Sequence, residues 1–150
     1  HNAIKQYLEA TEIFEKTIGT SAPLIILTFR KLAGLYRVIG QNERALLFYA
    51  RALTPLEETQ EQLMLLGDVH LNMAEIYEEF LEELNEKLSK TGDSKEQEEI
   101  KNDMQMQAEQ AHHHYLAASR IFRTELPNDH EMCQYVMNKL LYFNTLVLPR

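Results

Sequence analysis

The sequence predicts an all-α fold in which antiparallel helix pairs stack into a solenoid. Apolar residues recur at spacings of three and four along most of the 150-residue chain, as they do on one face of a helix. No stretch alternates for long enough to indicate a strand, and the 5 glycines and 4 prolines separate the periodic segments. A small-aromatic-small triplet also repeats on three of these segments. Together these observations predict helices joined by short connections, whose neighbours run antiparallel.

Helix start and stop signals set the boundaries of the expected helices. Thr54 and Pro55 predict a helix start, since threonine is a favourable N-cap and proline fits the first helical position. Gly40 and Gly92 follow periodic segments at the places where a left-handed C-cap is expected. The expected helices span about residues 2–18, 22–39, 42–53, 55–90, 95–125 and 129–146.

The repeated triplet decides how these helices are arranged. An alanine at a close approach lets two helix axes come near each other, and an aromatic ring one turn away fills the space beside it. Each helix pair then leaves an apolar face that only the next pair can cover, so the pairs stack. The first two triplets lie 42 residues apart, and the third follows 66 residues after the second. The triplets are Ala3/Tyr7/Ala10, Ala45/Tyr49/Ala52 and Ala111/Tyr115/Ala118.

At these residues the sequence resembles the tetratricopeptide repeat (TPR) family. The spacing of 42 residues is similar to the longer repeat variant of kinesin light chains. The resemblance implies one TPR-like domain over 1–150, in which helix pairs form a solenoid with a concave groove. The residues at the family's signature positions are Leu32, Ala33, Tyr36, Gly40, Ala45, Tyr49 and Ala52. The implied units are a B-helix of a partial repeat at about 1–19, a full repeat at 20–53, a longer repeat at 54–125 and a terminal or capping helix at 128–146.

An excess of 24 residues in the third repeat predicts an elongated helical hairpin at about 78–103. Coiled-coil-like spacing continues along both of its helices, and residues 91–94 form the turn. The hairpin is either a solvated projection or a second docking surface at its tip, and its 10 acidic and 4 basic residues indicate either solubility or a basic partner. The expected seam consists of Tyr77, Leu81, Leu84, Leu88, Ile100, Met104, Ala108 and Ala111.

The resemblance also implies which residues contact a partner. In the TPR family the first helix of each pair lines the groove that holds a segment of another protein. Asn72 matches the groove asparagine of kinesin-light-chain-like repeats, which there bonds to the ligand backbone. Basic residues on the second helix and acidic ones on the fourth favour a ligand of mixed charge. The alternative is that the basic residues pair with acidic neighbours across the groove. The implied groove residues are Leu27, Arg30, Lys31, Gly34, Arg37, Leu71, Asn72, Glu75, Glu79, Asn138 and Lys139.

Other chemically active residue types favour structural roles. His112, His113 and His114 point to different sides of a helix, because successive residues turn by about 100°. We therefore expect surface or inter-helix histidines rather than metal ligands. The sequence places no base beside Cys133, which is expected to be a buried or half-buried apolar residue. With no phosphate-binding or catalytic motif either, we expect no enzyme, no cofactor and no metal site.

Composition and charge exclude some classes of partner and indicate a cellular location. The net charge of −8 argues against nucleic acid, and no apolar run approaches the length of a membrane span. A single cysteine excludes an internal disulfide and is typical of a reducing compartment, so we expect a cytoplasmic location. The expected function is a scaffold or adaptor that binds a protein or peptide segment in its groove. The alternative is a structural or self-assembling segment of a larger helical-repeat protein.

Overall fold

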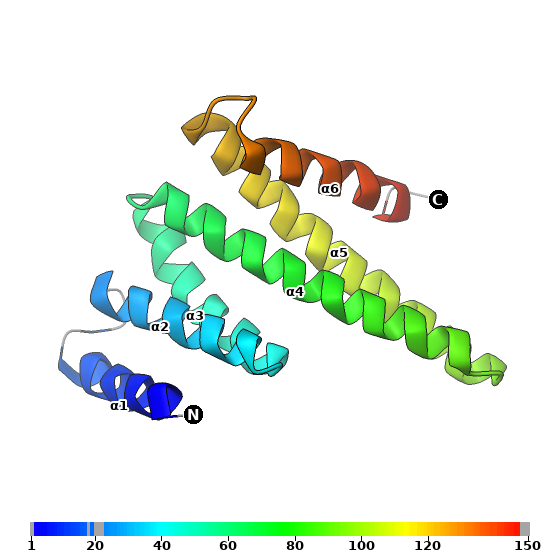
Figure 1. The fold of residues 1–150 in the computed structure, drawn as a ribbon, viewed down its shortest axis with the longest axis horizontal. Helices are drawn as coiled ribbons and strands as arrows, with labels where there is room; N and C mark the ends of the chain where they lie inside the picture. Colours follow the sequence, from blue (N-terminus) through cyan, green and yellow to red (C-terminus); the bar gives the residue numbers. More distant parts are fainter. Residues whose placement is uncertain (1, 18, 20–22, 148–150) are drawn as a thin grey trace. The chain divides into compact units, whose positions relative to one another are not determined.

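The computed structural model describes residues 2–17, 19 and 23–147, and every regular element in this part of the chain is an α-helix (Figure 1). This confirms the all-α fold class, whereas the solenoid arrangement stays a prediction. No helix among the described residues has the length and apolar character that a membrane crossing requires. The helices are α1 (Asn2–Thr17), α2 (Pro23–Val38), α3 (Asn42–Thr59), α4 (Leu63–Lys90), α5 (Ser94–Glu125) and α6 (Glu131–Val147).

The chain divides into two compact units, His1–Val69 and His70–Arg150, and the division falls within α4. In the first unit α2 packs against both α1 and α3. The ring of Phe48 on α3 stacks on Tyr36 of α2, with ring centroids 5.6 Å apart and an angle of 9° between the ring planes. Aromatic packing of this kind joins α2 and α3.

The second unit is formed by α4 from His70 onward, α5 and α6. Its core contains fully buried rings from α5 and α6, among them Tyr115 and Phe143, whose centroids lie 5.6 Å apart. Beyond this core α4 and α5 continue as a hairpin (Figure 1). The residues of the predicted seam are buried or half-buried, as a seam between two helices requires: Tyr77, Leu81, Leu84, Leu88, Ile100, Met104, Ala108 and Ala111.

The repeated triplets differ in burial. All three residues are buried in the copies on α3 and α5, as expected for small and aromatic residues at a close approach. In the first copy Ala3 is exposed, while Tyr7 and Ala10 are half-buried. The triplet therefore marks core positions in the second and third copies more fully than in the first.

The predicted helix start at Pro55 is wrong, because Pro55 lies inside α3. A proline within a helix removes one backbone hydrogen bond, and here it leaves the Arg51 carbonyl without its donor. The helix continues because Phe48, Ala52, Pro55 and Leu56 are all buried and follow one face of α3. Burial of that continuous face outweighs the local signal.

The end of α3 is formed by a residue without an obvious stop signal. Gln60 adopts the left-handed conformation, with φ 57°, and its backbone N–H donates to the Leu56 carbonyl. The Gln60 side-chain amide donates to the Glu57 carbonyl at 2.8 Å. These two bonds satisfy carbonyls at the helix end that otherwise lack partners.

Of the two predicted glycine caps, one is confirmed and one is wrong. Gly40 has φ 82°, its N–H donates to Arg37 O, and the N–H of Gln41 donates to Tyr36 O, which is a Schellman motif. Gly92 does not adopt positive φ. At that turn the Asp93 side chain caps α5 instead, by accepting from the Lys95 N–H.

The Gly40 cap leads to a stability prediction with an internal control. Gly40→Ala is expected to lower the free energy of unfolding by about 1 kcal/mol, because a side chain disfavours positive φ. Gly34→Ala, inside α2 with nothing within 4 Å of the added methyl, should raise it by about 0.5–1 kcal/mol. Urea denaturation of both variants tests this pair. Equal effects of the two changes would contradict the cap assignment.

Candidate functional site

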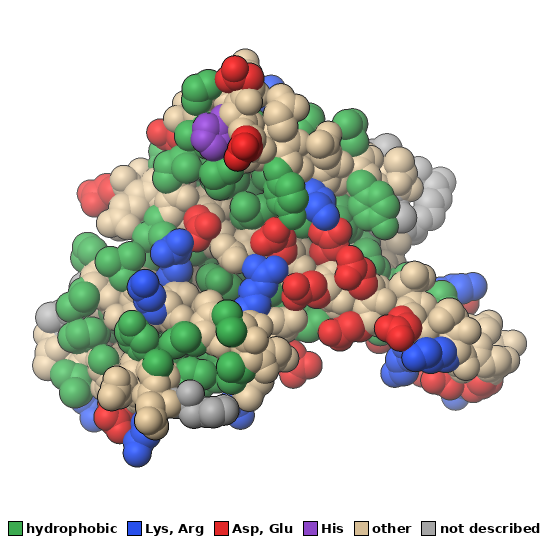
Figure 2. Space-filling model, viewed as in Figure 1, with side chains coloured by type: hydrophobic (Ala, Val, Ile, Leu, Met, Phe, Trp, Pro, Cys, Tyr) green, Lys and Arg blue, Asp and Glu red, His purple; other side chains and the backbone are tan. Residues whose placement is uncertain are grey.

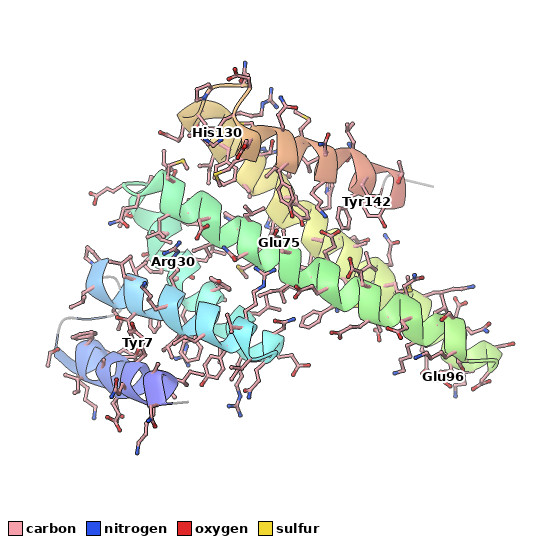
Figure 3. All side chains as sticks on the ribbon, in the orientation of Figure 1. Tyr7, Arg30, Glu75, Glu96, His130 and Tyr142 are labelled. Atoms are coloured by element: carbon pink, nitrogen blue, oxygen red, sulfur yellow. The ribbon has the colours of Figure 1, made fainter. Side chains whose placement is uncertain are left out.

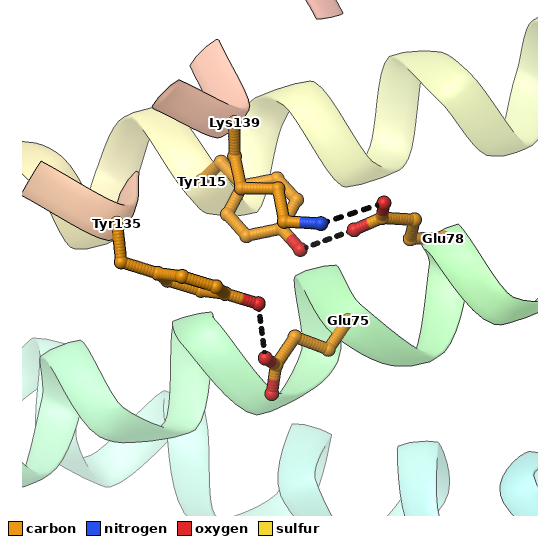
Figure 4. Close-up of polar contacts among 5 residues, drawn as sticks. All are labelled: Glu75, Glu78, Tyr115, Tyr135 and Lys139. Carbon is orange, nitrogen blue, oxygen red and sulfur yellow. Dashed lines mark hydrogen bonds and ion pairs between the residues drawn. The ribbon is translucent and has the colours of Figure 1, made fainter. Parts of the chain in front are cut away.

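The candidate site lies where α4 and α6 are joined in the second unit (Figure 4). The Tyr135 hydroxyl on α6 donates to Glu75 on α4 at 2.6 Å. Further along both helices, Lys139 donates to Glu78 at 2.8 Å. Both helices advance in the same direction between these two contacts, so α4 and α6 run parallel. The intervening helix, α5, contributes Tyr115, whose hydroxyl also donates to Glu78 at 2.6 Å.

Glu78 accepts two hydrogen bonds in this group. Its side chain is only 16% exposed, and a carboxylate removed from water needs compensating partners. The Lys139 ammonium and the Tyr115 hydroxyl supply them through the two carboxylate oxygens. Burial and the hydrogen bond to Glu78 raise the pKa of Tyr115 far above its usual value. Burial and the bond to Glu75 raise the pKa of Tyr135 to about 12, so both hydroxyls stay protonated donors at neutral pH.

One face of α4 carries a row of glutamates, which we call the acidic face: Glu75, Glu78, Glu79, Glu82 and Glu86. Figure 2 shows acidic side chains gathered along this helix, and Figure 3 shows Glu75 on its middle part. Like charges one turn apart repel each other in a helix. Lys139 offsets this repulsion at Glu78, and Lys90 offsets it at Glu86 through an ion pair of 3.1 Å.

A cleft of about 340 Å³ lies beside the acidic face, along the hairpin. Apolar side chains from both hairpin helices line it, namely Leu81 and Leu88 on α4 with Met104 and Ala108 on α5. Tyr142 contributes from α6 and is 53% exposed. The acidic face and an apolar cleft are therefore adjacent in the same unit.

The predicted groove residues divide between the two units. In the first unit, Leu27 and Lys31 are exposed, and Gly34 and Arg37 are half-buried. The Arg30 guanidinium donates to Asp68 at 2.8 Å, so pairing with an acidic neighbour is confirmed for this residue. One groove that includes the predicted residues of both units stays a prediction.

In the second unit the structure brings several predicted residues onto the α4–α6 face. Glu75 and Lys139 take part in the bonds that join the two helices, and Asn138 is exposed next to them in sequence. Asn72 and Glu79 are half-buried. Leu71 packs against the core of the unit.

Sequence reasoning missed the bond between Tyr115 and Glu78. A signal was present, because a tyrosine in a buried triplet must find a partner for its hydroxyl. The two residues are 37 positions apart, and nothing in the sequence indicated which carboxylate would supply the partner.

The histidines contain a second feature that was missed. His70 and His114 are buried, and their Nδ1 atoms lie 2.9 Å apart, so one ring donates to the other. The Tyr77 ring stacks on His114 at 5.7 Å. Burial, together with neighbouring histidines, lowers the pKa of His70 to about 4 and that of His114 to about 3. Both rings are therefore neutral at physiological pH.

The predicted placements of the histidine tract and the cysteine are confirmed. His112 pairs with Asn144 at 3.0 Å and His113 is exposed, so the three consecutive rings point to different surroundings. Within the described residues, no group of three or more His, Cys, Asp or Glu side chains is placed to hold a metal ion. Cys133 is buried, and its thiol donates to the Phe122 carbonyl.

Comparison of the sequence with models of known protein families and with curated proteins gives no match. The likeness to TPR proteins therefore depends on the residues that carry it, and the candidate site depends on its own geometry.

Proposed function

We propose that this chain is a non-catalytic protein-interaction module that binds a segment of a partner protein along the α4–α6 face. The observation that carries the proposal is the combination of exposed aromatic and polar side chains on α6 with the acidic face of α4. Tyr135 is 39% exposed and Tyr142 is 53% exposed, and Asn138 lies exposed between them in sequence. Tyrosine supplies large contact area at protein interfaces, and an amide both donates to and accepts from a peptide backbone.

The parallel course of α4 and α6 supports the same proposal. In the TPR family, the first helices of successive pairs run parallel and line the groove. By this likeness Leu27, Arg30, Lys31, Gly34 and Arg37 on α2 are the proposed binding residues of the first unit. Their share in binding is part of the proposal, as is the role of a scaffold or adaptor.

Photo-crosslinking tests this function. A photoreactive amino acid at Asn138 should crosslink to a distinct partner in an extract of the source cells, because this position is exposed on the proposed surface. The same amino acid at Arg123, exposed on α5 and outside the proposed contacts, is the matched control. Equal crosslinking from both positions would contradict a specific surface on α6.

A second function, self-assembly or packing within a larger helical-repeat protein, is favoured by another face of α6. Met137 and Leu141 lie one turn apart on this helix and are 39% and 61% exposed. Adjacent exposed apolar residues are typical of surfaces that pack against protein. In the same crosslinking experiment, a dominant product between two copies of this chain would favour self-assembly over partner binding.

A further inference from the structure

We propose that the cleft along the hairpin binds an amphipathic helix of a partner protein, with a lysine or arginine of that helix placed beside Glu82. This inference rests on the proposed function, because it names the chemistry of the partner segment. The cleft lies on the part of the hairpin next to α6, since Tyr142 of α6 lines it.

The shape of the cleft favours a helix as its occupant. The cleft lies along two antiparallel helices, α4 and α5, and contains apolar side chains from both. Its volume of about 340 Å³ falls in the range of sites that hold ligand groups. An apolar groove between helices is the usual receptor for the apolar face of an amphipathic helix. Leu81, Leu88 and Met104 would contact that face.

The charge at the edge of the cleft favours a basic residue in the occupant. Glu82 lines the cleft and is exposed. It lies on the acidic face between Glu78, which pairs with Lys139, and Glu86, which pairs with Lys90. Among the described side chains none forms an ion pair with Glu82, so its charge is available to a partner. A cation at this position would also relieve repulsion along the acidic face.

Lys101 makes the two walls of the cleft differ in charge. It lines the cleft from α5, whereas Glu82 lines it from α4, so the two walls carry opposite charges. A bound helix is therefore expected to turn its basic flank toward α4 and a polar or acidic flank toward α5. A second copy of this chain is a less complementary occupant, because each copy carries a net charge of −8.

Three charge variants and one designed probe test the inference. The probe is a fluorescein-labelled amphipathic peptide of leucine and lysine, about 14 residues or roughly four helical turns long. Its affinity is measured by fluorescence anisotropy at about 0.15 M salt, where charges more than about 8 Å apart are largely screened. Glu82→Lys should weaken binding by roughly tenfold, and Lys101→Glu should strengthen it by a few-fold.

The matched control is Glu83→Lys, which makes the same charge change on the same helix. Glu83 is exposed but does not line the cleft, so the affinity should change by less than about twofold. A peptide with serine in place of leucine should not bind detectably. Methyl NMR signals of Leu88 and Met104 should shift when the leucine–lysine peptide is added.

Two results would overturn the inference. Equal losses in Glu82→Lys and Glu83→Lys would show that the peptide senses only the overall negative charge. Binding of the serine peptide as tightly as the leucine peptide would show that the apolar cleft is not used. The Asn138 crosslink is measured separately. Absence of that crosslink, with peptide binding retained, would contradict the proposed function. A specific crosslink without peptide binding would contradict only the inference about the cleft.

Discussion

Replacing Tyr115 with alanine is expected to lower the free energy of unfolding by about 3–5 kcal/mol, the usual cost of removing a large buried aromatic ring. The side chain is fully buried and packs against Phe143, so its removal leaves a cavity between α5 and α6. It also deprives Glu78 of one of its two hydrogen-bond partners. Urea denaturation followed by circular dichroism measures the change.

Tyr115→Phe separates the two contributions. The ring remains and only the hydroxyl is lost, so the expected decrease is about 2 kcal/mol, typical of a hydrogen bond to a charged group. If the phenylalanine variant were as unstable as the alanine variant, the hydrogen bond rather than the packing would dominate. A decrease below about 1 kcal/mol for alanine would contradict the buried position.

Acidification from about pH 7 to about pH 5 should lower the free energy of unfolding by roughly 3–4 kcal/mol through the His70–His114 pair. In the folded chain the pKa values of His70 and His114 lie at about 4 and about 3, below the ordinary histidine value of 6.5. The unfolded chain therefore binds more protons throughout this interval. The contribution of the pair is complete above pH 6.5 and is lost as the pH falls toward the folded-state values.

A double replacement isolates this effect from that of the carboxylates. His70→Leu combined with His114→Leu removes both buried rings, so the unfolding free energy should depend less steeply on pH than in the wild-type chain. His113→Gln, at an exposed position, should retain most of the wild-type dependence. Urea denaturation at several pH values provides the comparison. An unchanged slope in the double variant would rule out the pair as its source.

The helices could be predicted from the sequence because their apolar spacing is repeated over many turns. The Gly40 cap could also be predicted from the sequence, since a left-handed cap has a strong preference for glycine. Pro55 misled the prediction because its signal is local, whereas the buried face of α3 extends over several turns on both sides of it. A local rule fails where burial of a longer segment outweighs it.

The candidate site could be predicted from the sequence only in part, since its contacts join distant parts of the chain. Glu75 and Lys139 could be proposed from their positions in the repeat. The bond between Tyr135 and Glu75 spans 60 residues, and that between His70 and His114 spans 44. Such pairs depend on how far one helix is displaced along another. That displacement is determined by packing and is not encoded in the spacing of residues within either helix.

The acidic face of α4 has a consequence for how α6 finds its position. Its glutamates recur about once per turn, so sliding α6 by one turn, about 5.4 Å, would bring Lys139 opposite Glu82 instead of Glu78. The charges would be nearly as well matched in either arrangement. The buried rings would not, because Phe143 would lose its contact with Tyr115. In this unit the charges on α4 and α6 would permit more than one register, and the shape of the core selects a single one.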